Sequence, residues 1–552
     1  MGRSLTMHWS ANFLRAVICV LSAAIILLGS TSCGGGSSSG PSQQPPTITT
    51  QPASATISTG QTANLSVAAT GNSSLTYQWY QGTSGDTSKP VGTNSSTFTS
   101  SPLNTSASFW VGVSDSGGTT DSSTASINVV TPPPNAIPST YMGMHMNGGI
   151  DGISGQQPWP VVPFGAVRLW DADVAWADIN SGPSAYDFTK LNSWFSLIPQ
   201  HGADILYTFG RVPSWASSNP TDTTCGFAPG SCDAPIGLNS DGSGSDDVFQ
   251  QFVTQLVTQS VNSSAGHIKY YELWNEMDNP PSWNGTIQQM VRMNTDAILA
   301  IHSLDPSAVI LIPSTIIEGV IGRNYLQTYL LAAAPFLPSI GAVAFHGYVQ
   351  QSGDPLDPES IVTYINQTRS ILAPTVLGSK PLFDTEASWG DPSVSNPPFT
   401  DPDMQSGFLA RMYLLQWSES IARFYWYQWN NKRDGILWTP DPNNPAGAGT
   451  VLAPGVAYGQ VYQWLVGTVM SQACSSSGPV WTCELTSTNG YQALAVWDAS
   501  QSCSNGQCTT SNYSFSSQYV QYRDLAGNTT SITGQSSVPI GAKPILLENQ
   551  PR

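Results

Sequence analysis

The chain has 552 residues, too many for one compact domain, so we expect about three folded units. Hydrophobic residues make up 40% of it, whereas charged residues make up only 10%, against an average of about 25%. The formal net charge of −17 comes from 18 Lys and Arg against 35 Asp and Glu. This balance excludes nucleic acid as an expected partner, because phosphate binding needs clustered basic side chains.

The first 32 residues have the pattern of an export signal peptide. Arg3 and Arg15 supply positive charge, and the apolar run over 16–28 is too short to span a membrane comfortably. Small residues then precede Cys33, as in the lipobox of bacterial lipoproteins, although Ser30 stands where Leu is usual. This resemblance implies a surface or periplasmic lipoprotein whose only link to a membrane is lipidated Cys33. Plain secretion, with Cys33 removed or idle, is the alternative.

The other cysteines outside the signal fall in three close pairs. They are Cys225 with Cys232, Cys474 with Cys483, and Cys503 with Cys508. An even number at short spacing in an exported protein predicts loop disulfides formed in an oxidising compartment. Metal ligation is the competing interpretation, but no Cys-x-x-Cys pair and no nearby His supports it, so no metal site is expected.

Before the main domain, composition marks a tether, a small domain and a second linker. Residues 33–45 are rich in Gly and Ser, as flexible linkers are. Residues 46–131 alternate short strands with Gly, Asn and Ser turns, and resemble a bacterial immunoglobulin-like domain with Trp79 as its core tryptophan. Residues 132–138 form a proline-rich linker.

Residues 139–458 alternate apolar strands with amphipathic helices, which argues for a parallel sheet covered by helices. The clearest helix is expected over 246–261, with others over 188–198 and 404–417. The first helix is poorly marked, since its segment is proline-rich. A (β/α)8 barrel is expected, with a doubly wound sheet as the alternative. The eight strand candidates are 141–146, 165–171, 204–210, 268–275, 308–314, 342–348, 381–387 and 423–429.

The tail over 459–552 loses the helices after VYQWLVG (461–467) and then shows strand patterns. It is similar to the small β-sandwich that often follows the barrels of clan A glycoside hydrolases.

Two glutamates meet the main chemical requirement of glycoside hydrolysis, a pair of carboxyl groups that flank the scissile bond. Glu276 directly follows the fourth strand candidate, and Glu386 lies at the end of the seventh. Active sites of such barrels form at the C-terminal ends of the strands. We therefore expect the two carboxyl groups to meet there.

The segments around both glutamates resemble clan A glycoside hydrolases, most closely family 39. YELWNEMD resembles the signature of strand four, and FDTEASWG resembles the nucleophile segment of strand seven. The resemblance covers about 139–552. It implies Glu276 as acid/base and Glu386 as nucleophile, with Asn275 bonding the sugar 2-hydroxyl, an interaction that strengthens in the transition state.

The same resemblance assigns further substrate-binding residues. HGY at 346–348 matches a strand-six His-x-Tyr, so Tyr348 would hydrogen-bond the nucleophile and His346 would contact sugar or the acid/base. Arg168 would support the nucleophile. Either Trp426 or Trp429 would supply an aromatic platform, and His145 and Trp215 are further candidates for the cleft.

Three points reach beyond the resemblance. Aromatic walls from Trp274 and Trp283 would raise the pKa of Glu276, while Arg168 and Tyr348 would lower that of Glu386. The insertion that carries Cys225 and Cys232 has no counterpart in the resemblance. Asp171 and Asp173 either bind substrate or are turn residues.

Together these features predict a retaining O-glycosyl hydrolase that acts on a β-linked polysaccharide or oligosaccharide, without a cofactor and as a monomer. The alternative is a surface glycan-binding lipoprotein whose barrel is catalytically inactive.

Overall fold

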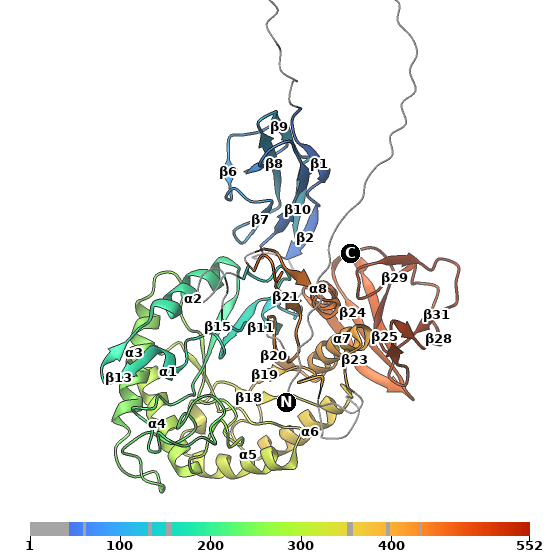
Figure 1. Cartoon of the computed structure of the whole chain (residues 1–552). Coiled ribbons are helices and arrows are strands. Elements are labelled where there is room, and N and C mark those ends of the chain that lie inside the picture. The colour runs from blue at the N-terminus through green and yellow to red at the C-terminus, as the bar shows by residue number, and fades with distance from the viewer. Residues whose placement is uncertain are drawn as a thin grey trace, which may run out of the picture.

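The structure, a computed structural model, contains an all-β domain, a closed barrel and a second β-domain in chain order (Figure 1). The expected signal peptide and Cys33 lie outside the described residues, so lipidation stays a prediction. Within the described part of the chain, no helix is both long and apolar enough to cross a membrane. The described residues are 44–58, 62–130, 135–148, 150, 157–349, 357–393, 398–430, 433–445 and 447–552.

The first domain is a sandwich around Trp79, as its alternating pattern predicts. Trp79 is fully buried opposite Val111 on the neighbouring strand, and its ring stacks on that of Phe98 with 5.7 Å between centroids. The sequence has no cysteine between Cys33 and Cys225, so packing alone holds this core. Its strands are β1 (Thr47–Thr50), β2 (Ala55–Ser58), β3 (Asn64–Ser66), β4 (Ala68–Thr70), β5 (Thr76–Gln81), β6 (Pro90–Val91), β7 (Thr97–Thr99), β8 (Ala107–Asp115), β9 (Gly118–Asp121) and β10 (Ala125–Val130).

The barrel has a strand at each of the eight expected positions. They are β11 (Met142–His145), β12 (Ala166–Leu169), β15 (Asp204–Thr208), β16 (Tyr270–Glu272), β17 (Val309–Leu311), β18 (Val343–His346), β19 (Leu382–Ala387) and β20 (Ile421–Trp426). All pair in parallel, in the order β17-β16-β15-β12-β11-β20-β19-β18. Bridges from Leu311 to Ala342 and from Ile316 to His346 close the ring. The doubly wound alternative is therefore wrong.

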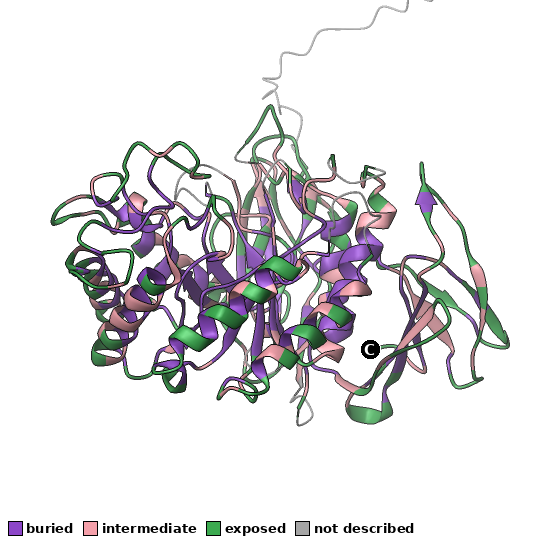
Figure 2. Ribbon diagram, turned by 90° about the horizontal axis from the view of Figure 1, so that it is seen from below, coloured by how far each residue is buried: buried purple, intermediate pink, exposed green. Residues whose placement is uncertain are grey.

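Helices surround the strands with their apolar faces inward, and Figure 2 shows buried strands inside helices with exposed outer faces. The described residues between β11 and β12 contain no helix, in line with the proline-rich sequence. Smaller elements of the barrel are η1 (Ser139–Tyr141), β13 (Asn180–Gly182), β14 (Ala185–Tyr186), η2 (Leu337–Ser339), β21 (Trp438–Thr439) and β22 (Thr450–Val451). The helices are α1 (Trp176–Ile179), α2 (Thr189–Gln200), α3 (Asp247–Asn262), α4 (Ile287–Leu304), α5 (Val320–Ala333), α6 (Ser360–Leu372), α7 (Pro402–Ser418) and α8 (Ala453–Leu465).

One expected domain boundary needs correction. The division between residues 458 and 459 falls inside α8, which runs to Leu465 and packs against α7. The reason is that the buried face of α8 continues beyond Tyr458 through Val461 and Trp464. The last barrel helix therefore includes the segment that we expected to open the C-terminal domain.

The C-terminal domain packs one face of its main sheet against the barrel. Along β25, Ala495 and Trp497 join the barrel core, whereas Leu494 and Val496 join the separate core of this domain. This alternation is the period of two that a strand imposes. Its elements are β23 (Val469–Ser477), β24 (Val480–Thr486), η3 (Thr488–Gly490), β25 (Gln492–Asp498), β26 (Cys503–Ser504), β27 (Gln507–Cys508), β28 (Ser511–Ser514), β29 (Gln521–Arg523), β30 (Thr529–Ser531), β31 (Ser537–Ile540) and β32 (Ile545–Glu548).

All three expected disulfides are present and confirm the pairing by proximity. They are Cys225–Cys232 in the connection from β15 to α3, Cys474–Cys483 between β23 and β24, and Cys503–Cys508 between β26 and β27. Their sulfurs are thus unavailable as thiolate ligands for a metal.

Candidate active site

Glu276 lies in the segment that continues β16 beyond its C-terminal end. Backbone hydrogen bonds hold this segment between the segments that follow β15 and β17. Asn275 N–H donates to Phe209 O at 3.1 Å, and Met277 N–H donates to Ser314 O at 3.0 Å. Glu276 itself has φ 47°, in the left-handed region that non-glycine residues rarely occupy. Such backbone conformations collect at functional sites, where the surrounding structure enforces them.

Glu386 lies within β19 and receives two hydrogen bonds on its carboxylate. Arg168 Nη1 donates to Oε2 at 2.7 Å, and the Tyr348 hydroxyl donates to Oε1 at 3.0 Å. Tyr348 reaches it from the segment after β18, where Gly347 lies against Asp384. A Cβ on Gly347 would lie 2.2 Å from Asp384 Oδ2, so only glycine fits between His346 and Tyr348.

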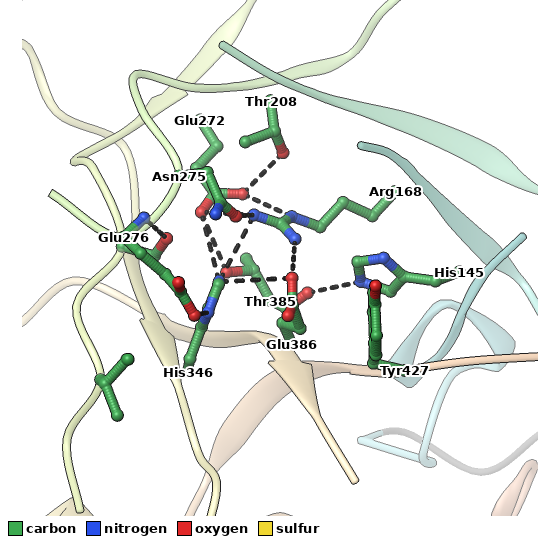
Figure 3. A network of polar contacts seen from close by, with 12 residues as sticks. His145, Arg168, Thr208, Glu272, Asn275, Glu276, His346, Thr385, Glu386 and Tyr427 are labelled. Atoms are coloured by element: carbon green, nitrogen blue, oxygen red, sulfur yellow. Dashed lines mark hydrogen bonds and ion pairs between the residues drawn. The ribbon is translucent and has the colours of Figure 1, made fainter. Parts of the chain in front are cut away.

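Arg168 is the centre of the network in Figure 3, where it joins β12, β16 and β19. It is fully buried, and its Nε and Nη2 donate to Glu272 at 2.7 and 3.0 Å. Nη2 also donates to Asn275 Oδ1 at 2.8 Å. Thr208 and Thr385 donate to the remaining lone pairs of Glu272 at 2.8 and 3.1 Å. A buried ion pair that is so fully hydrogen-bonded fixes the guanidinium in one place.

Sequence reasoning missed Glu272, although a signal existed. It lies four residues before Glu276, within the run Tyr270–Trp274, whose other residues are apolar or aromatic. A charged residue is almost never fully buried unless it is paired. The position of Glu272 on an inner strand therefore predicted a basic side chain as its partner. Arg168 was the basic residue already expected at this end of the barrel.

His346 faces the other carboxylate. Its Nδ1 lies 2.9 Å from Glu276 Oε1, and Asn279 Nδ2 donates to Glu276 Oε2 at 2.7 Å. Burial alone raises the pKa of Glu276, but the hydrogen bonds and charge of His346, with the bond from Asn279, bring it below its ordinary value. Burial lowers the pKa of His346, yet the charges of Glu386 and Glu276 leave it raised.

The pKa directions of the two glutamates are the reverse of those expected from the sequence. Burial raises the pKa of Glu386 by more than His346 and Arg168 lower it. Glu276 has the imidazole as a direct partner, which outweighs its loss of solvent. Trp274 and Trp283 are buried in the barrel core, and Trp274 Nε1 donates to Ser282 O at 3.1 Å. The imidazole of His346 and the carboxyl group of Glu276 are thus placed to share a proton across a 2.9 Å contact.

The expected tryptophan platform does not fit the structure. Trp426 is fully buried, with its Nε1 donating to Gly435 O at 2.8 Å and its ring against Trp389. Trp429 is also buried and stacks on Trp438 with 6.3 Å between centroids. Neither offers an exposed ring face to a sugar.

Tyr427, between those two tryptophans, is the aromatic residue of this segment that reaches the site, and sequence reasoning passed over it. It is half-buried, its hydroxyl donates to Asp171 Oδ2 at 2.7 Å, and its ring lies 5.1 Å from that of His145 (Figure 3). His145 is buried and its Nε2 lies 2.8 Å from Thr385 O. Trp426 is the last residue of β20 and points into the core, whereas Tyr427 follows the end of that strand.

Two further candidates lie apart from this network. Trp215 is half-buried, and its Nε1 donates to Asn180 O at 2.8 Å. Asp173 has φ 56° and forms a half-exposed ion pair with Lys190 at 3.2 Å, which agrees with a turn residue.

The two candidate catalytic carboxylates lie close together. One oxygen of Glu276, one of Glu386 and a ring nitrogen of His346 all lie within 4.8 Å of one another. Two carboxylates and an imidazole can ligate a divalent cation. However, the Arg168 guanidinium already compensates Glu386, and a cation beside it would be repelled. The arrangement is thus better suited to proton transfer and nucleophilic attack than to metal binding.

Comparisons with known proteins agree with this architecture. Residues 44–133 match the model of the Ig-like domain associated with CHU_C, which confirms the immunoglobulin-like domain. No curated protein matches the sequence. A family 39 glycoside hydrolase from the gut symbiont Bacteroides cellulosilyticus WH2 has a TM-score of 0.54 and 12% identity, over 91% of this chain and 99% of that one. The chain therefore has the fold of a family 39 glycoside hydrolase, as the resemblance implied.

Two other solved structures are similar over smaller parts of the chain. A monomeric β-xylosidase from Caulobacter crescentus CB15 is 14% identical, with a TM-score of 0.48 over 76% of this chain and 97% of that one. The catalytic domain of a GH30 xylanase C from Talaromyces cellulolyticus is 12% identical, with a TM-score of 0.47 over 75% and 98%.

Proposed function

We propose that the protein is an exported, retaining glycoside hydrolase that cleaves β-glycosidic bonds, with Glu386 as nucleophile and Glu276 as acid/base. The observation that carries the proposal is the approach of one oxygen of each carboxylate to within 4.8 Å of the other at the C-terminal ends of barrel strands. Retaining enzymes hold their carboxyl groups about 5–5.5 Å apart, whereas inverting enzymes need about 6.5–9.5 Å to admit a water. The short separation favours retention.

In the first step, a Glu386 oxygen forms a bond to the anomeric carbon as the glycosidic C–O bond breaks. The leaving oxygen takes a proton from Glu276, and the sugar becomes an ester of Glu386. Water then attacks the anomeric carbon, gives a proton to Glu276 and releases Glu386. Arg168 and Tyr348 orient the attacking carboxylate, and Asn275 would bond the sugar 2-hydroxyl.

The proton for the first step is supplied by the His346–Glu276 pair. With Nδ1 2.9 Å from Glu276 Oε1, the proton needs only a short transfer to reach the carboxyl group that faces the leaving oxygen. Substrate that displaces water from the site favours the neutral carboxylic acid, because desolvation disfavours the ion. A raised pKa for Glu276 in the complex, absent from the unliganded site, is thus part of the proposal.

The disulfides and the immunoglobulin-like domain suit a protein that acts outside the cytoplasm. We propose that the chain is carried there by its signal peptide and acts as a monomer on a carbohydrate polymer or a fragment of one.

The test is hydrolysis of β-linked polysaccharides and nitrophenyl β-glycosides by wild type and by Glu386→Ala. We expect wild type to release sugar with the β anomer formed first, and Glu386→Ala to lose about 10⁴-fold or more of the rate. Azide, as a small external nucleophile, should restore part of that rate and give an α-glycosyl azide. Initial release of the α anomer would contradict retention. Equal binding of a polysaccharide by both proteins, without cleavage by either, would favour a glycan-binding protein instead.

A further inference from the structure

The insertion between β15 and α3 carries a disulfide loop, residues 225–232, that lies at the rim of the candidate active site. The bond between Cys225 and Cys232 closes it. Gly226 N–H donates to Pro281 O at 2.9 Å, and Asn284 N–H donates to Cys232 O at 2.7 Å. Both partners belong to the connection that follows Glu276. The disulfide loop is therefore fixed to the segment that positions the proposed acid/base.

Phe227 at the tip of this loop remains 48% exposed, although its ring has two firm contacts. The Arg211 guanidinium carbon lies 4.0 Å from its centroid, and the Trp170 ring packs on it edge-to-face at 5.4 Å. Arg211 also lies 4.5 Å from the Trp170 centroid, and its φ of 57° marks an enforced backbone. Within the described residues, Arg211 Nε has no hydrogen-bond acceptor, so the two rings take that place.

A continuous series of contacts joins this aromatic corner to the nucleophile. Arg211 Nη2 forms an ion pair with Asp171 Oδ1, and Asp171 Oδ2 accepts the hydrogen bond from Tyr427 at 2.7 Å. Asp171 is close enough for its negative charge to contribute to the raised pKa of Glu386. Tyr427 in turn packs against His145, which is hydrogen-bonded to the residue before Glu386.

We propose that Phe227, Arg211 and Asp171 form an additional sugar subsite, away from the subsites on either side of the cleaved bond. In it, the exposed part of the Phe227 ring stacks on the apolar face of a pyranose ring. A single exposed aromatic side chain is ordinary on a protein surface. Here the ring is held in place by a disulfide, a guanidinium and an indole, beside charged groups that can bond hydroxyls, which is the composition of a ligand site. This inference rests on the proposed function and extends it to chains longer than one sugar.

If this subsite exists, the preference of the enzyme for longer substrates depends on Phe227, whereas the type of glycosidic bond that it cleaves does not. The experiment compares kcat/KM on nitrophenyl β-xyloside or β-glucoside with that on xylo- and cello-oligosaccharides of increasing length, for wild type, Phe227→Ala and Phe227→Tyr. Phe227→Ala should lower the ratio of the rate on the longest oligosaccharide to that on the aryl glycoside by about tenfold. Phe227→Tyr keeps the ring and should keep the ratio.

The matched control is Ile236→Ala, which removes an exposed apolar side chain (43% exposed) from the same connection but outside the disulfide loop. It should behave as wild type. An unchanged ratio in Phe227→Ala would overturn the subsite while leaving the hydrolase intact.

A binding arm separates the subsite from catalysis. Retardation of Glu386→Ala, with and without Phe227→Ala, is measured in native gels that contain soluble xylan or β-glucan. Retardation that is lost with Phe227→Ala supports the subsite, even if wild type cleaves nothing and the proposed hydrolysis fails. Equal retardation of both proteins, or retardation of neither, overturns it.

Discussion

His346 contacts both candidate catalytic carboxylates: its Nδ1 lies 2.9 Å from Glu276 Oε1, and its Nε2 lies 3.9 Å from Glu386 Oε2. Burial lowers the pKa of this imidazole, but the two negative charges raise it above its ordinary value of 6.5. The pKa of Glu276 moves the opposite way, below 4.5, because the imidazole offsets its burial. The two groups are thus coupled, and a proton can pass between them across the 2.9 Å contact.

The first prediction concerns the pH dependence of activity. The pair keeps its proton below the raised pKa of His346 and loses it as pH rises through that value, so the alkaline limb of kcat/KM should lie above pH 6.5. In His346→Gln only Glu276, with an ordinary pKa of 4.5, holds the proton, so the limb should move to lower pH by about one unit or more. Rates on a nitrophenyl glycoside across pH measure this.

His302→Gln, on α4, is the matched control and should keep the wild-type profile. An unshifted alkaline limb in His346→Gln would contradict the shared proton.

The same two pKa shifts make the free energy of unfolding depend on pH. The pair stabilises the fold between the two folded pKa values, and the gain is lost below as Glu276 protonates and above as His346 deprotonates.

The second prediction separates the roles of the two glutamates. Glu276→Ala removes the proton donor, so hydrolysis of glycosides with basic leaving groups should fall about 10²–10⁴-fold. Dinitrophenyl glycosides, whose leaving group needs no proton, should still form the glycosyl-enzyme at nearly the wild-type rate. Glu386→Ala should lose both activities. Pre-steady-state release of dinitrophenol gives the answer, and equal losses on both substrates in Glu276→Ala would reverse the assignment.

The third prediction concerns the buried pair of Arg168 and Glu272. Both side chains are fully buried, with Nε and Oε2 2.7 Å apart. Glu272→Gln leaves the guanidinium with less compensating charge and should cost about 3–5 kcal/mol of unfolding free energy. It should also lower kcat, because Arg168 positions Glu386. Urea unfolding measures the first effect and initial rates the second.

A partly exposed pair supplies the control for that experiment. Arg369 and Glu419 lie 2.9 Å apart with side chains 33% and 22% exposed, so Glu419→Gln should cost no more than about 1 kcal/mol. A cost for Glu272→Gln as small as that of Glu419→Gln would mean that the buried network does not fix Arg168.

The fourth prediction tests the joint between the barrel and the C-terminal domain. Trp497 on β25 is fully buried, and its Nε1 donates to Glu359 Oε1 at 2.8 Å, beside Arg411, which is ion-paired with the same carboxylate. Trp497→Ala should cost about 3–5 kcal/mol and lower the midpoint of thermal unfolding. Tyr513→Ala, half-exposed on β28, should change it little. Calorimetry should show the barrel and this domain unfolding together in wild type, and separate transitions would contradict the shared core.

Local pattern predicted much of the architecture. Strands such as β19 and helices such as α3 lie within a few residues of their expected positions, because apolar periodicity reports directly on one buried face. The boundary after residue 458 was wrong because α8 is buried through Trp464 against elements distant in sequence. The cysteine pairing was predicted from spacing alone, because two cysteines separated by a short loop lie close enough in space to form a disulfide.

Part of the candidate site could be predicted from the sequence, and part could not. Glu276 and Glu386 follow from strand ends, because the C-terminal ends of parallel strands must meet at one end of a barrel. Arg168 and Tyr348 were expected from the resemblance to clan A glycoside hydrolases. The sequence by itself thus determined the alternation of parallel strands and helices and the two carboxylates at strand ends, whereas the tertiary structure decided that the sheet closes into a barrel. Only the tertiary structure decided that Tyr427 reaches the site instead of Trp426 or Trp429, that Glu272 holds Arg168, and that His346 reverses the expected order of the glutamate pKa values. Each of these depends on distances between side chains from different strands, which no periodicity along one strand encodes.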